Sequence, residues 1–368
     1  MSIFSYGMRY WKKHVPCAVF CQVLGFIAIA LDLLLPLLSA LYVDYLLTAD
    51  GVGSGDGNLF SFLVDGRFGE PQTWRLFFSV TLVFAAFVLV REVVIYLRNV
   101  LFQFNGLQFE NEMRDYTYKK LVELDSGTVA TYNTGELLTT LNSDIITFKE
   151  MLSRVLQNLG DSFFVLALSS VILALNSAWM LLIPIIIAPV LIAVLIRYTK
   201  AARRVSQNIR TNNARLNLTV QENINAVRLV RSFANEDVEE SKFDKVNADL
   251  RTAYFEQVDV SAKYNLAFNI IRQVAYIATI AIGALLVLHD VFLVGIMTAC
   301  ITYVLKIMDH LTQVSNNMYQ LQYGLVSGGR IMEFLEKKTR IPEPAHPEKV
   351  SRRAGIELKG GSITAEGK

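Results

Sequence analysis

The sequence contains little cysteine. Only three cysteines occur among 368 residues, at Cys17, Cys21 and Cys300. All three lie within or at the start of apolar runs, and their spacing is not that of a four-ligand zinc site. They are therefore interpreted as small apolar residues. Neither a disulfide nor a metal centre is predicted.

The sequence also lacks a surplus of charge of either sign. The formal net charge is +2, from 35 Lys and Arg against 33 Asp and Glu. A nucleic-acid-binding domain concentrates basic residues on one face or along one helix. Here the basic residues are spread along the charged stretches between apolar runs, so nucleic acid is excluded as a partner.

Long apolar runs, by contrast, dominate the chain. Hydrophobic residues make up 53% of it, too many for a soluble domain with a mostly polar surface. About 20 apolar residues are enough to cross a bilayer. Six membrane spans are predicted, at residues 15–47, 76–104, 155–175, 180–196, 270–288 and 291–307. We therefore predict an all-α, multi-pass membrane protein.

The distribution of Lys and Arg predicts how the chain crosses the membrane. Arg9, Lys12 and Lys13 precede the first span, and residues 197–269 carry twelve more basic residues. Residues 48–75 carry only two. Cytoplasmic loops hold the excess of positive charge, so the N-terminus is predicted to be cytoplasmic. The membrane is the plasma membrane, or the inner membrane if the cell is bacterial.

The connections between spans are of two kinds. Residues 176–179 and 289–290 are tight outer turns. Residues 105–154 and 197–269 are long, contain no proline and keep apolar residues at helical spacing. The spans are therefore predicted to continue into the cytoplasm as helices. Each of these two inner excursions turns around once, through a short transverse segment.

The two transverse segments are predicted at residues 126–133 and 225–235. Both contain aromatic or apolar residues that are expected to be exposed: Tyr132 in the first, and Val227, Val230 and Phe233 in the second. Exposed apolar residues far from the membrane favour a docking surface. The alternative is an ordinary hairpin turn of a membrane coiled coil.

Several motifs then occur in a characteristic order. Thr134-Gly135-Glu136-Leu137-Leu138 and Asn142-Ser143-Asp144 follow the first segment, and Gln221-Glu222-Asn223 precedes the second. Gly295, Tyr303 and the stretch Leu325–Leu335 come later. In order and spacing, the chain resembles the transmembrane half of an ATP-binding cassette (ABC) exporter.

The resemblance implies the six-helix exporter transmembrane fold, with long cytoplasmic extensions and two coupling helices that dock on nucleotide-binding domains. The matching residues are Ser126, Val129, Tyr132 and Asn133 in the first coupling helix, and Val227, Arg228, Val230, Phe233 and Asn235 in the second. The family often has paired aromatics in the first coupling helix, and here Tyr132 is the only one. A second transporter half is also implied, with homodimer and heterodimer both open.

The resemblance further implies that ATP and Mg²⁺ bind the nucleotide-binding domain. A phosphate-binding loop needs G-x-x-x-x-G-K-[ST], and residues 361–368 have one residue too many between the glycines and no hydroxyl residue after the lysine. This chain therefore shows no ATPase motif of its own. We expect a transmembrane domain over 1–340, a linker over 341–355, and over 356–368 the first strand of an incomplete nucleotide-binding domain. The chain is either a fragment or a truncated gene product.

Charged residues inside the spans are candidates for the translocation pathway, since charge is costly in a membrane. Counting inward from the outer ends of the spans places them at one predicted layer. They are Asp32, Arg91, Glu92, Asp161, Arg272, Lys306 and Asp309. Two interpretations fit: a structural inner interface with paired and snorkelling charges, or a polar belt that contacts an amphipathic substrate.

Three functions follow from these observations. The first is the transmembrane half of an ATP-driven exporter of a small molecule, peptide or lipid, surrounded by membrane lipids. The second is a membrane scaffold or regulatory subunit that kept the fold and lost the pump. The third is a secondary transporter, a class typified by inverted repeats and interrupted helices.

Overall fold

The computed structural model describes residues 10–47, 74–130, 132, 134–289, 291 and 293–337. Within these ranges the protein is helical and contains no strand. The α-helices are α2 (Val15–Leu47), α3 (Trp74–Glu123), α4 (Ser126–Ala130), α5 (Thr134–Thr139), α6 (Ile145–Glu150), α7 (Leu156–Asn176), α8 (Ala178–Asn225), α9 (Val227–Ser232), α10 (Glu236–Leu288) and α11 (Val294–Glu336). Two π-helical segments, η2 (Thr140–Asp144) and η3 (Met151–Val155), join α5, α6 and α7 into one helical run. The predicted all-α fold is confirmed.

Four helices are much longer than a membrane requires. Helices α3, α8, α10 and α11 have 50, 48, 53 and 43 residues. At 1.5 Å per residue they are about 65–80 Å long, whereas a bilayer core is about 30 Å thick. As the proline-free charged stretches predicted, each helix continues well beyond its apolar run.

Five helical stretches have the length and hydropathy of a membrane span. They are Val15–Ala40, Leu137–Asn176, Ala178–Asn225, Glu236–Leu288 and Val294–Glu336. The remaining predicted span, 76–104, lies within α3, and Arg91, Glu92 and Arg98 interrupt its apolar run. The positions of the membrane boundaries within these helices stay predictions.

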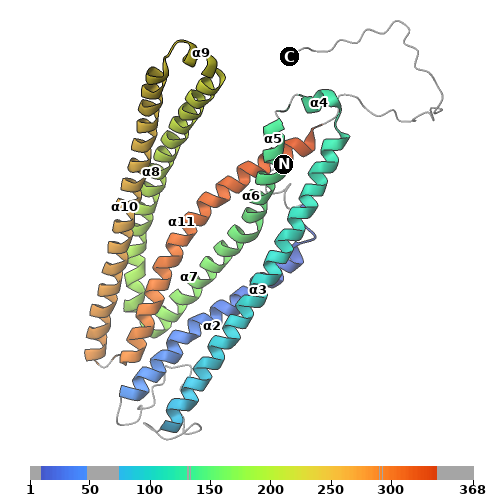
Figure 1. The fold of residues 1–368 in the computed structure, drawn as a ribbon. Helices are drawn as coiled ribbons and strands as arrows, with labels where there is room; N and C mark the ends of the chain where they lie inside the picture. The colour runs from blue at the N-terminus through green and yellow to red at the C-terminus, as the bar shows by residue number, and fades with distance from the viewer. Residues whose placement is uncertain are drawn as a thin grey trace, which may run out of the picture.

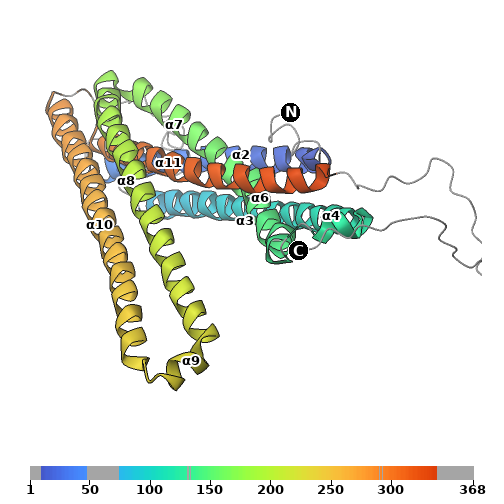
Figure 2. The ribbon, with the colours of Figure 1, turned by 90° about the horizontal axis from the view of Figure 1, so that it is seen from above.

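The long helices form a bundle and an arm (Figure 1). The bundle consists of α2, α3, α6, α7 and α11, and the arm of α8 and α10 joined by α9. Figure 2 shows that the arm diverges from the bundle. Helices α4 and α9 lie at one end of the molecule, which we call the α4/α9 end. The α7–α8 and α10–α11 turns lie at the other, the hairpin end (Figure 1).

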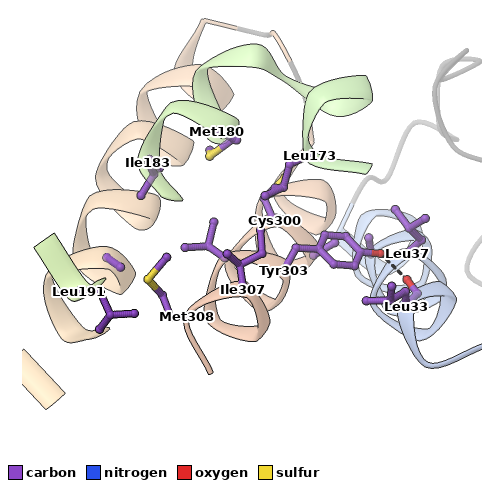
Figure 3. Packing of buried hydrophobic residues seen from close by; sticks show 14 of the residues in the cluster. Leu33, Leu37, Leu173, Met180, Ile183, Leu191, Cys300, Tyr303, Ile307 and Met308 are labelled. Atoms are coloured by element: carbon purple, nitrogen blue, oxygen red, sulfur yellow. Dashed lines mark hydrogen bonds between the residues drawn. The ribbon is translucent and has the colours of Figure 1, made fainter. Parts of the chain in front are cut away.

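One hydrophobic core joins the arm to the bundle. Helix α11 contributes Tyr303 to this core, and the Tyr303 side chain is fully buried. The hydroxyl of Tyr303 donates a hydrogen bond to the backbone carbonyl of Leu33 on α2. On other sides of α11 lie Leu173 of α7 and Met180 of α8 (Figure 3). Because buried residues of five helices, α2, α7, α8, α10 and α11, contribute to this core, it holds the arm at its base.

A second core lies closer to the α4/α9 end, within the bundle. Helix α3 contributes Phe109 and Met113, and the α6–η3 run contributes Phe148 and Met151. Gly324 of α11 packs against this run. A Cβ atom added to Gly324 would lie 2.2 Å from the Cβ of Met151. Helix α11 can approach the run this closely only because residue 324 has no side chain.

We predict that Gly324→Ala destabilises the bundle. The added methyl group cannot fit without a backbone shift, and such overpacking costs about 1–3 kcal/mol. The measurement is the thermal unfolding midpoint of the purified protein. Gly106→Ala on α3 is the matched control, because its added Cβ would meet its nearest neighbour at an ordinary 3.6 Å. Equal midpoints for the two variants would contradict the close approach.

Candidate functional site

Asp32 joins three helices within the apolar part of the bundle. Its carboxylate lies 2.9 Å from the guanidinium of Arg91 on α3. The ammonium of Lys306 on α11 pairs with the same carboxylate and lies 3.3 Å from the Asp32 backbone carbonyl. The Asp32 side chain is 28% exposed. The structure therefore brings together three of the predicted pathway residues, one from each helix.

One further predicted residue, Glu92, lies beside this group, and two others, Arg272 and Asp309, form a separate pair. Glu92 accepts a 3.0 Å hydrogen bond from Arg91, but its side chain is 56% exposed. Arg272 of α10 lies 3.4 Å from Asp309 of α11, and both side chains are about half exposed. This second pair connects the arm to α11.

Asp161 has a different environment from the rest of the predicted layer. Its carboxylate accepts a 2.6 Å hydrogen bond from Arg98 of α3 and a 2.9 Å bond from Gln22 of α2. Gln22 lies ten residues before Asp32, and Arg98 lies seven residues after Arg91. These separations correspond to about 15 and 10 Å along the helices. The predicted single layer thus resolves into ion pairs at two levels of α2 and α3.

Arg98 is the main charged residue that was not predicted for this region. A signal for it exists, because residues seven apart lie on the same helix face, and Arg98 is seven residues after Arg91. Gly25 makes room for it: a Cβ added there would lie 2.5 Å from the Arg98 guanidinium carbon. His310, next to Asp309, was also missed, and its Nδ1 lies 3.2 Å from the Ser162 hydroxyl.

Every predicted pathway residue therefore has an oppositely charged partner within 4.0 Å. An unpaired charge in a low-dielectric interior costs several kcal/mol, whereas a pair with good geometry offsets much of that cost. The arrangement is chemically suited to hold helices together. It is equally suited to exchange one of these partners for a charged group of a ligand.

The first transverse segment is short and well capped. Helix α4 follows Asp125, whose carboxylate accepts hydrogen bonds from the Thr128 amide at 2.9 Å and hydroxyl at 2.7 Å. Such a cap satisfies a free amide at a helix N-terminus. Of the predicted coupling residues, Ser126 is exposed and Val129 is half-buried. Asn133 lies outside the described residues.

Tyr132 differs from the expectation that it is exposed. It is only partly exposed, and its ring packs edge-on against Phe334 of α11 at a centroid distance of 6.0 Å. The ammonium of Lys337 lies 5.8 Å from the same ring. The expectation that Tyr132 is exposed was wrong, because the end of α11 packs against the ring; its docking role stays a prediction. The contact instead links the first transverse segment to α11.

The second transverse segment is mostly exposed, although Val230, which was expected to be exposed, is half-buried. None of the residues of α9 is buried. Val227 and Arg228 are exposed and Val230 is half-buried, while Phe233, just after the helix, is 69% exposed. Leu229 is also exposed and adds to the apolar surface.

The turn that closes this segment is tight. Ala234 adopts a positive φ of 51°, and the Asn235 amide donates a 3.0 Å bond to the carbonyl of Val230. Asn235 occupies the N-cap position of α10, but its side chain forms no cap hydrogen bond. Below the turn, Lys242 of α10 lies 3.3 Å from Glu222 of α8. The tip of the arm therefore presents an apolar surface on a closed turn.

The fold and these sites define an all-α, multi-pass membrane protein with two short helices at one end. The family described as the ABC transporter transmembrane region matches residues 19–311. The chain belongs to this family, which confirms the resemblance inferred from the sequence motifs.

Curated relatives agree with this assignment. The chain is 26% identical over 284 residues to an uncharacterized ABC transporter ATP-binding protein, YknU, of Bacillus subtilis, covering 77% of this chain and 48% of the relative. It is 23% identical over 373 residues to a putative multidrug export ATP-binding/permease protein, YgaD, of the same species, covering 100% and 60%. It is 23% identical over 309 residues to an ATP-dependent lipid A-core flippase of Mannheimia succiniciproducens, covering 83% and 52%. The chain spans about half the length of these relatives.

We predict that Asp32→Asn destabilises the protein more than Glu92→Gln does. The first change leaves Arg91 and Lys306 without their shared carboxylate, at a cost of about 1–3 kcal/mol after allowance for partial exposure. The second change removes a carboxylate that is more than half exposed. The thermal unfolding midpoints of the two variants in the same detergent measure the difference. A midpoint for Asp32→Asn at or above that of Glu92→Gln would rule out a structural role for the three-helix pairing.

Proposed function

We propose that this protein is the transmembrane half of an ATP-driven ABC exporter. It forms the translocation pathway for an amphipathic small molecule, peptide or lipid. Family membership supports this proposal, as do relatives whose names describe multidrug export and lipid A-core flipping. ATP and Mg²⁺ bind on nucleotide-binding domains, and a second transmembrane half completes the pathway.

The exposed tip of the arm is the observation that carries this proposal. Helix α9 lies at the end of two helices of about 70–80 Å (Figure 1), and its Val227 and Leu229 side chains are exposed. Uncovered apolar surface of this kind marks a protein contact. We assign α9 and α4 as the coupling helices that receive motion from the nucleotide-binding domains. The basic residues of the α8–α10 arm support a cytoplasmic position for this end and for the N-terminus, in the plasma membrane or, in a bacterial cell, the inner membrane.

The arm and bundle provide a way to transmit this motion. The arm contacts the rest of the chain mainly at its base, where the core around Tyr303 lies. A displacement of α9 therefore reaches the membrane as a tilt of α8 and α10 relative to the bundle. The Arg272–Asp309 pair crosses this boundary, and both of its side chains are half exposed. It is the pathway pair that such a tilt is expected to alter first.

Docking of α9 is tested by photo-crosslinking. We predict that p-benzoylphenylalanine at Phe233, in the complete transporter, forms an adduct with a nucleotide-binding domain that peptide mass spectrometry identifies. The same reagent at Val258 is the control, because Val258 is comparably exposed but lies far from the tip of α10. Adducts from position 233 that contain only lipid or this chain itself would contradict the coupling role. They would favour a scaffold or secondary transporter that uses no ATP-driven motor.

We predict that Arg272→Gln changes how the complete transporter responds to charged amphiphiles. If Arg272 contacts substrate, its loss should raise the half-maximal stimulating concentration of anionic compounds about tenfold, equivalent to about 1.4 kcal/mol. The measurement is ATP hydrolysis over a panel of anionic, neutral and cationic amphiphiles. Lys263→Gln is the control, since it also removes a positive charge from α10 at an exposed position. An unchanged response in Arg272→Gln would favour the purely structural interpretation of the charged residues.

A further inference from the structure

A cleft lies between α8 of the arm and α11. Its volume is about 650 Å³, and its lining includes Arg203, Gln207 and Arg210 from α8 and Tyr319, Tyr323 and Arg330 from α11. A volume of this size is in the range of small-molecule sites. None of the residues that were predicted for the pathway or for coupling lines it. The cleft is therefore distinct from the sites described above.

Two arginines in the cleft carry charge that no carboxylate neutralises. The guanidinium of Arg203 donates to the side-chain carbonyl of Gln322, and that of Arg210 donates to the hydroxyl of Tyr323. Both acceptors are neutral. In the part of the chain that the structure describes, no Asp or Glu oxygen lies within 4.0 Å of either guanidinium. Arg330 differs, because it pairs with Asp144. The cleft thus has an excess of positive charge.

The aromatic residues add hydrogen-bond donors and flat apolar surface. The Arg210 guanidinium carbon lies 5.9 Å from the centre of the Tyr323 ring. The Tyr323 hydroxyl accepts a 2.8 Å bond from the Tyr319 hydroxyl as well as the bond from Arg210. These two interactions lower the pKa of the Tyr323 hydroxyl, which lies outside the predicted spans. The Tyr323 hydroxyl is the acceptor in both bonds, so its hydrogen can be donated to an anion.

One end of the cleft lies close to the predicted membrane surface. The fourth predicted span ends at Ile196, and Arg203 follows seven residues later, about 10 Å along the helix. The headgroup layer extends about 5–8 Å beyond the hydrocarbon core. Arg203 therefore lies just beyond this layer, and its long side chain can extend back toward the headgroups, while Arg210 lies about 20 Å from the span end. The cleft therefore begins near the lipid headgroups and continues toward α9.

We propose that the cleft between α8 and α11 binds a phosphate-bearing anion, namely the headgroup of an anionic phospholipid, held by Arg203 and Arg210. Planar guanidinium groups form paired, charge-assisted hydrogen bonds with phosphate oxygens. The tyrosine rings and Val326 cover the less polar part of the headgroup. The occupant bridges the arm and α11. This proposal goes beyond the proposed function, because the anionic phospholipid is a bound ligand of the cleft and not the transported substrate.

The experiment is a lipid titration of the purified transporter complex without nucleotide. Dioleoyl phosphatidylglycerol and dioleoyl phosphatidylcholine are added separately, and native mass spectrometry counts the retained molecules. Wild-type protein is expected to retain phosphatidylglycerol in preference to phosphatidylcholine. Combined Arg203→Gln and Arg210→Gln changes are expected to weaken phosphatidylglycerol retention about tenfold or more, because charge-assisted bonds are lost. Replacing both residues with lysine should restore only part of the binding, because lysine keeps the positive charge but cannot form the paired hydrogen bonds.

Arg204→Gln is the matched control, because Arg204 is the exposed neighbour of Arg203 on α8 and does not line the cleft. Equal retention of the two lipids by wild-type protein, or equal losses in the control and the double variant, would overturn the proposal. Competing inorganic phosphate distinguishes the source of the anion. Displacement of the lipid supports a site that reads phosphate alone, and no displacement supports one that also needs the acyl chains. Because no ATP is present, the result stands whether or not the motor assignment holds.

Discussion

The burial of Tyr303 against α2 is the contact on which the rest of the structure depends. Helix α11 carries this residue and packs against both the bundle and the arm. The hydrogen bond from Tyr303 to Leu33 satisfies the one polar atom of a fully buried ring. This core is the apolar contact that holds the base of α8 and α10 against the bundle. The length of the arm beyond that base then follows from the absence of proline in residues 197–269.

Ion pairing imposes a second constraint on the same helices. Asp32 connects α2, α3 and α11 within the apolar region, and Arg98 with Asp161 connects α3 and α7. Each pair fixes how its helices are rotated about their axes, since a rotation would strand a charge in the apolar interior. The bundle is therefore held by both packing and charge. The half-exposed Arg272–Asp309 pair adds a charged contact between α10 of the arm and α11.

Helix identity and length were predictable from the sequence, because apolar runs and the absence of proline act locally. The tight turns at Ser177 and His289 and the short helices α4 and α9 were also found near their predicted places. Partners across helices were harder to predict. Arg98 as the partner of Asp161, and the packing of Phe334 over Tyr132, depend on the rotation and stagger of separate helices. Periodicity within one helix does not determine those quantities.

The central claim is that this chain works with an ATP-hydrolysing motor. The most direct test is to isolate the complex from its native membrane, measure ATP hydrolysis, and identify every chain by mass spectrometry. We predict hydrolysis, together with peptides of an ABC nucleotide-binding domain from a copurifying chain or from sequence beyond Lys368. A complex without such peptides and without hydrolysis would contradict the account.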